Sequence, residues 1–216
     1  MAETDTRHVG ALERAAASGD AGAWGALLTE HGERLRRMVA FRMDPRLRGR
    51  VDAADVVQEA YLAAAHGRTE YFRTPTAPVF VWLRGVVWNK LLEAHRHHLG
   101  TEMRDAGREA ARTSSPAGRD ATSAALVDRL TGSGTGPGTA AGRAEVAARL
   151  RQALDAMEPT NREVLALRHF EQLTNGEAAA VLGIREKAAA KRYVRALKRL
   201  KEVLAAMPGG LTEVRP

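Results

Sequence analysis

Residues Thr174 to Leu204 read TNGEAAAVLGIREKAAAKRYVRALKRLKEVL. Thr174 and Glu177 have the spacing of a capping box, in which each side chain accepts a hydrogen bond from a backbone amide at the start of a helix. Gly183 suits the left-handed turn that ends such a helix. A second helix is indicated by apolar residues at helical spacing, namely Tyr193, Leu197, Leu200 and Leu204. The stretch therefore predicts two helices joined by a tight turn, which is a helix-turn-helix.

The second of these helices is strongly basic. Between Arg185 and Lys201 there are eight Lys or Arg residues and one acidic residue, Glu186. A solvated helix usually mixes charges of both signs, so the excess favours contact with nucleic-acid phosphates. The alternative is a basic amphipathic helix on a helical core, with its charges only in water. We interpret the pattern as a DNA-binding module, although this module alone does not indicate which kind of protein carries it.

Composition points to the same class of partner. The 216 residues include 33 Lys plus Arg and 26 Asp plus Glu, which gives a net charge of +7 and favours a polyanionic partner. The chain has no Cys, so disulfides and thiolate metal sites are excluded. No apolar run approaches the length of a membrane span, and the N-terminus lacks the apolar core of a signal peptide. We expect a cytoplasmic protein without membrane insertion.

The chain divides into two helical regions and a segment of different composition. Residues 100–142 are rich in Gly, Ser, Thr, Ala and Arg, which predicts a flexible linker with a short helix around Ser123 to Leu130. Thr160 and Glu163 have the spacing of a second capping box. No sustained alternation of polar and apolar residues indicates a strand. The expected fold is all-α, with two small helical domains at 1–99 and 143–207, the linker between them and a tail at 208–216. The expected helices are Val9 to Ala17, a helix that carries Trp24 to Val39, a helix that begins near Asp52 and includes Asp55 to Ala65, Val79 to His98, Arg143 to Met157, a helix from Thr160 through Phe170, and the helix-turn-helix.

Two further motifs precede the helix-turn-helix. Residues Asp55 to Glu59 read DVVQE, and Trp82 to Asn89 read WLRGVVWN. In this order the three motifs resemble conserved regions 2 and 4 of the bacterial sigma-70 family, in its compact extracytoplasmic-function group. The resemblance covers roughly Leu12 to His98 and Arg143 to Leu204. It implies an alternative sigma factor, which binds core RNA polymerase, recognises a two-part promoter and helps to melt it.

The resemblance assigns a polymerase-binding role to one side of the third helix. Asp55, Gln58, Glu59 and Leu62 share that side at helical spacing. In the family the matching strip binds the clamp helices of the largest polymerase subunit, and a second contact is made with the flap of the second-largest subunit. The alternative for the strip is ordinary solvated surface. An anti-sigma factor is a further partner that the resemblance implies.

Residues for the two promoter elements are assigned in the same way. For the minus-10 element the resemblance implies a base-capturing loop at Tyr71 to Thr76, and the polar side of the following helix; the residues are Tyr71, Phe72, Arg73, Asn89, Lys90, His95 and Arg96. Phe80 and Trp82 are better explained as core. For the minus-35 element it implies the second helix of the helix-turn-helix, with Lys187, Ala188, Lys191, Arg192, Arg195, Lys198 and Arg199. The sequence of this helix looks like that of a planctomycete-type subgroup.

Intrinsic catalysis is not expected. The chain has no Gly-rich phosphate loop with a Lys-Ser/Thr ending, no Ser-His-Asp order and no spaced carboxylate pair. The cluster of His95, His97 and His98 lacks further ligands for a metal ion, so we expect neither a metal nor a cofactor. The rival hypothesis is a stand-alone transcriptional regulator, with the same helix-turn-helix and an N-terminal sensing or dimerisation domain.

Overall fold

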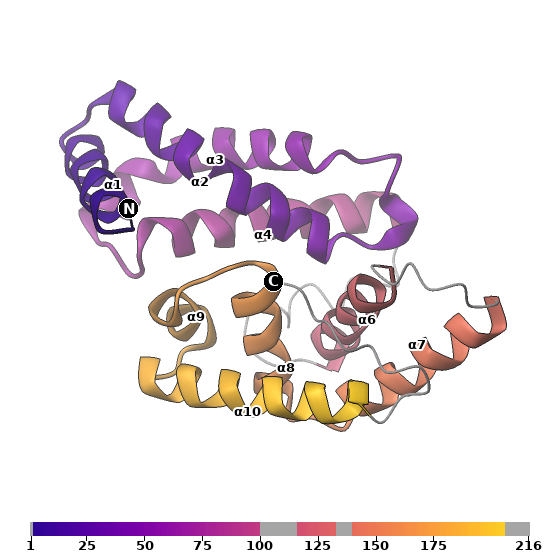
Figure 1. Cartoon of the computed structure of the whole chain (residues 1–216). Coiled ribbons are helices and arrows are strands. Elements are labelled where there is room, and N and C mark those ends of the chain that lie inside the picture. Colours follow the sequence, from indigo (N-terminus) through magenta and orange to yellow (C-terminus); the bar gives the residue numbers. More distant parts are fainter. Residues whose placement is uncertain (1, 100–115, 133–139, 206–216) are drawn as a thin grey trace.

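A computed structural model describes residues 2–99, 116–132 and 140–205, and every regular element in these ranges is helical. Figure 1 shows two layers, with α1 to α4 in one and α6 to α10 in the other. The prediction of an all-α fold is confirmed. None of the described helices is both long and apolar enough to cross a membrane.

The N-terminal layer is a helical bundle, and two of its long helices begin at capping aspartates. The Asp20 carboxylate accepts a hydrogen bond from the amide of Ala23, and the Asp52 carboxylate accepts one from the amide of Ala54. The expected start at Asp52 is therefore confirmed. The elements are α1 (Ala2–Ala17), α2 (Ala21–Arg42), the 3-10 turn η1 (Pro45–Leu47), α3 (Ala53–Arg73) and α4 (Val79–Leu99).

The C-terminal layer contains the helix-turn-helix. Its elements are α6 (Pro116–Gly132), α7 (Ala140–Asp155), α8 (Pro159–Leu165), the π-helical turn η3 (Ala166–Phe170), α9 (Asn175–Leu182) and α10 (Glu186–Ala205). The predicted capping box at Thr160 and Glu163 is wrong. Glu158 is the N-cap and Pro159 is the first helical residue, a position that suits proline because its missing amide would have no partner there.

The segment that was expected to be a linker contains α6, which is longer than the predicted short helix. Leu126 and Val127 of α6 are buried in one core cluster with Leu150 and Leu154 of α7. The Ser123 hydroxyl also donates a hydrogen bond to the Asp155 carboxylate at 2.7 Å. Residues 116–132 therefore belong to the C-terminal layer, whereas the Gly-rich residues 133–138 lie outside the described part of the chain.

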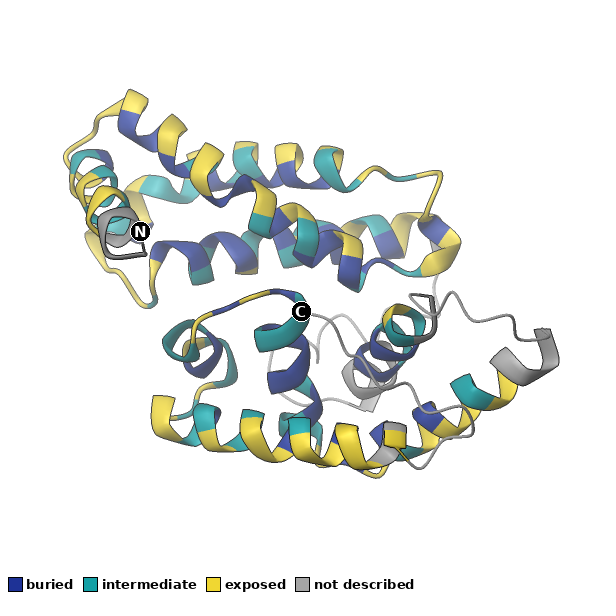
Figure 2. Cartoon of the chain, viewed as in Figure 1, coloured by how far each residue is buried: buried dark blue, intermediate teal, exposed yellow. Residues whose placement is uncertain are grey.

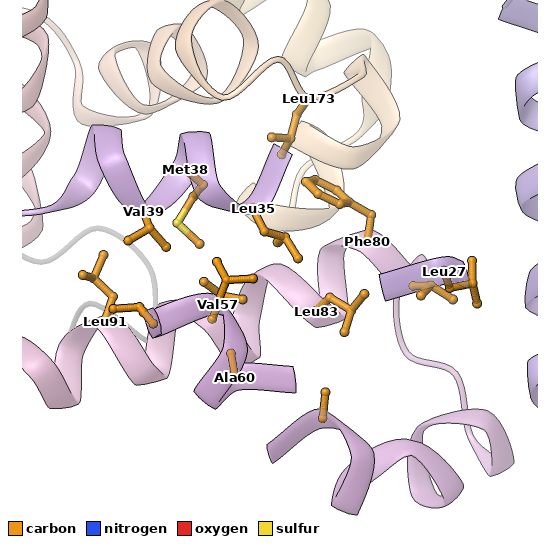
Figure 3. Close-up of a cluster of buried hydrophobic side chains, with 14 of the residues drawn as sticks. Leu27, Leu35, Met38, Val39, Val57, Ala60, Phe80, Leu83, Leu91 and Leu173 are labelled. Carbon is orange, nitrogen blue, oxygen red and sulfur yellow. The ribbon is translucent and has the colours of Figure 1, made fainter. Parts of the chain in front are cut away.

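Each of the two layers is stabilised by an apolar core. The larger lies inside the N-terminal bundle, and Figure 3 shows Leu35, Met38 and Leu83 in it. Leu173, from the turn before α9, is buried in this same cluster. Conversely, Phe41 of α2 is buried in the smaller C-terminal core. The two layers therefore share apolar contacts and pack directly on one another.

One buried histidine makes the stability of this packing depend on pH. His31 of α2 is buried, with its ring 5.4 Å from that of Phe80. Burial, together with the neighbouring charge of Arg34, lowers the pKa of His31 to about 4, against an opposing effect of Glu177. The unfolded chain then binds more protons than the folded chain between the ordinary pKa and this value.

We expect the free energy of unfolding to fall on acidification from pH 7 to pH 5, with about 1 to 2 kcal/mol of the loss due to His31. Urea denaturation at both pH values measures this loss. His31→Gln should show a smaller pH dependence than the wild type, and the matched change at exposed His98 should not. An unchanged pH dependence in His31→Gln would contradict the prediction.

Candidate polymerase and nucleic-acid interfaces

The strip predicted on α3 forms an exposed face. Asp55, Gln58, Glu59 and Leu62 are all exposed, and the Leu62 side chain reaches 69% exposure. The opposite side of the helix is buried through Val56, Val57 and Ala60. An exposed leucine next to two carboxylates and an amide offers a partner both apolar and directional polar contacts.

The segment at the end of α3 differs from the expectation. Tyr71, Phe72 and Arg73 form the last turn of the helix, so the loop consists of residues 74–78 only. The helix continues through Gly67 and ends at Arg73, just before Thr74 and Pro75, because the residue that precedes a proline disfavours helical conformation. The predicted loop at Tyr71 to Thr76 is therefore wrong in its first half.

Tyr71 is part of an aromatic cluster. Its ring stacks on Trp82 with centroids 4.5 Å apart, and its hydroxyl donates a hydrogen bond to the carbonyl of Ala77 at 2.7 Å. Burial, with a smaller effect of Glu13, raises the pKa of Tyr71 to about 12. Phe72 is half-buried with its edge against Trp24. Of the three aromatic and basic residues predicted here for DNA, only Arg73 is exposed, where it pairs with Glu70.

The polar side of α4 is exposed only in part. Asn89 and Arg96 are exposed, and half-buried Lys90 pairs with Glu93 at 2.6 Å. His95 is buried, and its Nε2 accepts a hydrogen bond from the amide of Asp44 at 3.3 Å. Burial lowers the pKa of His95, against a smaller opposing effect of Asp44. The prediction that His95 faces DNA is therefore wrong, because this side of α4 packs on the connection after α2.

The helix-turn-helix forms as its sequence predicts. The Thr174 hydroxyl accepts from the amide of Glu177 at 3.1 Å, and the Glu177 carboxylate accepts from the amide of Thr174 at 2.7 Å. Gly183 ends α9 with φ of 63°, in the left-handed region. The capping box and the turn are both confirmed, and they orient α10 relative to α9.

The basic residues of α10 gather on the side away from the core. Ala189, Ala196 and Leu200 are buried, which turns the polar side outward, as the exposed faces of α10 in Figure 2 show. Ala188 is half-buried at the edge of this side. The exposed predicted residues are Lys187, Lys191, Arg195, Lys198 and Arg199.

Two residues of α10 modify the predicted interface. Arg192 is half-buried and pairs with Glu158 at 2.5 Å, so it connects α10 to the start of α8. Val194, which we did not predict, is 66% exposed among the basic residues. Its position three residues after Lys191 and four before Lys198 was a usable signal. The two methyl groups of this exposed valine are suited to apolar contact with a thymine methyl group in the major groove.

The described residues contain no group of three or more His, Cys, Asp or Glu side chains that could hold a metal ion. The arrangement consists instead of two exposed polar faces, on α3 and α10, and a smaller one on α4. These faces are suited to binding macromolecules.

Comparison with known proteins identifies the class. Residues 147–200 match the family model described as Sigma-70, region 4. The chain is 28% identical over 200 residues to the RNA polymerase sigma factor CnrH of Cupriavidus metallidurans, covering 90% of this chain and 93% of the relative. It is 27% identical over 204 residues to the RNA polymerase sigma factor NccH of Alcaligenes xylosoxydans, with the same coverage.

Among solved structures, the chain is similar to CnrH in its complex with the cytosolic domain of CnrY. The identity is 26%, the TM-score is 0.48, and the match covers 91% of this chain and 97% of the other. The family match spans α8 to α10, where the capping box, the turn and the basic face lie, and the two curated relatives match along most of both layers. These similarities show an alternative sigma factor that directs transcription initiation, and they relate the chain to the extracytoplasmic-function group of sigma-70 factors.

Proposed function

We propose that this sigma factor binds core RNA polymerase through the exposed face of α3. The observation that supports this role is the joint exposure of Glu59 and Leu62 on the side of α3 that the bundle leaves uncovered. A polar helix face of this kind makes directional contacts with a basic partner. The clamp helices of the largest subunit are the proposed partner. The flap of the second-largest subunit is the proposed partner of the C-terminal layer.

We propose that promoter DNA is read by two separate faces. Asn89 and Arg96 of α4, with Arg73 and the loop at residues 74–78, contact the minus-10 element and help to melt it. The exposed basic residues of α10, together with Val194, enter the major groove of the minus-35 element, where Arg can donate two hydrogen bonds to guanine. Tyr71 and His95 are left out of this proposal because both are buried.

The resemblance to the family also supports an anti-sigma factor as a restraining partner, and the cytoplasm as the place where the protein acts. The planctomycete-type subgroup stays an interpretation of the α10 sequence alone.

Transcription in vitro tests the proposal. Purified chain added to core RNA polymerase should give run-off transcripts that start at specific promoters in a genomic library. The rival, a stand-alone regulator, would bind duplex DNA by itself and would give no transcripts until another sigma factor was added. That second outcome would overturn the proposed function.

A further inference from the structure

A buried carboxylate lies where the two layers meet. Glu171, directly after η3, is fully buried between two arginines of the N-terminal layer. It accepts hydrogen bonds from Arg42 Nε at 2.7 Å and from Arg84 Nε and Nη2 at 2.7 and 3.1 Å. Burial by itself raises the pKa of Glu171, but the opposite charges and hydrogen bonds of Arg84 and Arg42 outweigh it. The pKa therefore lies below its ordinary value, and the carboxylate is charged at neutral pH.

Arg42 connects α2 to two further segments of the C-terminal layer. Its guanidinium donates to both carboxylate oxygens of Glu163 in α8, at 2.5 and 3.1 Å. It also donates to the hydroxyl of Thr122 in α6 at 3.0 Å. A single arginine of α2 therefore contacts α6, α8 and the residue after η3.

Two ion pairs lie beside this cluster. Arg34 of α2 pairs with Glu177 at 2.7 Å, and its guanidinium also lies 3.6 Å from the centroid of the Phe80 ring. Glu177 is the capping residue of α9, so the contact reaches the helix-turn-helix itself. Arg48 pairs with Asp128 of α6 at 2.8 Å. Each ion pair between the layers joins a basic residue of the N-terminal layer to an acidic residue of the C-terminal layer.

Apolar side chains also join the layers, since Leu167, Leu173 and Ala178 of the C-terminal layer are buried in the core cluster of the N-terminal bundle. Phe41 stacks on Phe170 with centroids 5.1 Å apart and ring planes 11° from parallel. Leu173 lies near Leu35 and Phe80 in Figure 3, in the same buried cluster. To place Leu173 there, the preceding Gln172 adopts φ of 58°. A left-handed residue other than glycine costs on the order of 1 kcal/mol, which the contact between the layers offsets.

The ionic part of this contact has nearly balanced energies. Burying two arginines and a carboxylate costs several kcal/mol of hydration for each ion, and their attraction returns about the same amount. When the layers separate, water solvates all three charges. Removal of one partner is different, because it leaves the remaining charges buried without compensation and so favours separation. The exposed strip of α3 and the basic side of α10 stay accessible while the layers are in contact. These two helices lie at opposite edges of the body in Figure 1.

We propose that the Glu171 cluster, made of Arg42, Arg84, Glu163 and Glu171, is a clasp that closes the free sigma factor and opens when the protein joins core RNA polymerase. In the closed form the C-terminal layer of the chain binds to the surface of α2 and α4 around Arg42 and Arg84. The link to polymerase rests on the proposed function. Closure fixes the α4 and α10 faces in one body, whereas polymerase has to place them on two separate promoter elements.

The free protein provides the first test. Because the chain has no Cys, Thr69→Cys and Gln152→Cys place two spin labels on exposed sites of α3 and α7. Double electron–electron resonance should give one narrow distance distribution for the otherwise unchanged protein. Glu171→Ala and Glu171→Gln should each give a broader distribution with longer distances. The control Glu33→Ala, which removes an exposed carboxylate paired within α2 to Arg36, should match the unchanged protein. Circular dichroism confirms retained helices, and a distribution unaltered by both Glu171 variants would overturn the clasp.

Polymerase binding provides the second test. If the open form is a tenth of the population, removing the clasp tightens the apparent Kd for core enzyme by about ten-fold. Glu171→Ala should bind core enzyme more tightly than the wild type, and Glu33→Ala should bind equally well. Altered spin-label distances with unchanged affinity would overturn the role of the clasp in polymerase binding. A wild-type chain that binds no core enzyme would overturn the proposed function instead, while leaving the distance result in place.

Discussion

Glu59→Lys is expected to abolish binding to core RNA polymerase. Glu59 is exposed on α3 beside Leu62, so reversing its charge leaves the buried side of the helix untouched. Placing a cation where a basic partner docks costs several kcal/mol, which corresponds to a loss of affinity on the order of 100-fold or more. Fluorescence anisotropy with labelled protein and purified core enzyme measures this loss.

The matched control is Glu30→Lys, the same charge reversal at an exposed position of α2 outside the proposed strip. It should bind core enzyme like the wild type. Both variants should keep the helical content and melting temperature of the wild type. Full affinity in Glu59→Lys would remove the α3 face from the proposed polymerase interface.

The double change Lys191→Ala and Arg195→Ala is expected to eliminate recognition of the minus-35 element. Both side chains are exposed on the polar side of α10, while the core contacts of this helix come from other positions. A good base contact is worth about 1 to 3 kcal/mol, so the pair should cost at least about 30-fold in promoter-specific transcription. Run-off assays with reconstituted holoenzyme measure the effect, and the salt dependence of binding should become weaker.

The comparison template carries a scrambled minus-35 element. On it the double variant and the wild type should differ little, because the lost contacts were specific to that element. Arg149→Ala with Arg151→Ala on α7 is the charge-matched control and should retain promoter preference. An equal loss on both templates would show that these residues supply only non-specific attraction.

Local features of the fold were predictable because each depends on residues close together in the chain. A capping box such as that of Thr174 and Glu177 is complete within a single helical turn, and Gly183 is the residue type that a left-handed turn requires. The strip on α3 was predictable for a similar reason, since helical spacing alone places Glu59 and the buried Val57 on opposite sides of the helix. Proline at the start of α8 followed an equally local rule, which the competing Thr160 pattern obscured.

Site residues were misplaced where tertiary contacts decide exposure. His95 has the polarity of a DNA contact, yet its partner is the amide of Asp44, 51 positions earlier. Tyr71 was expected in a loop, but α3 continues and the ring stacks on Trp82. In both cases the residue type permits either role, and only the packing of α4 against its neighbours selects one.

The sequence by itself determined the helices, the helix-turn-helix and the polar faces of α3 and α10, because spacing within a helix sets which side chains share a side. Only the tertiary structure decided that the two layers close on one another. Arg42 and Glu171 are separated by 129 positions, and Arg84 and Glu171 by 87. No local sequence pattern marks such a pair, since a single Arg or Glu in a sequence is normally interpreted as a solvent-exposed residue. The contact exists because folding brings opposite charges together where water is excluded.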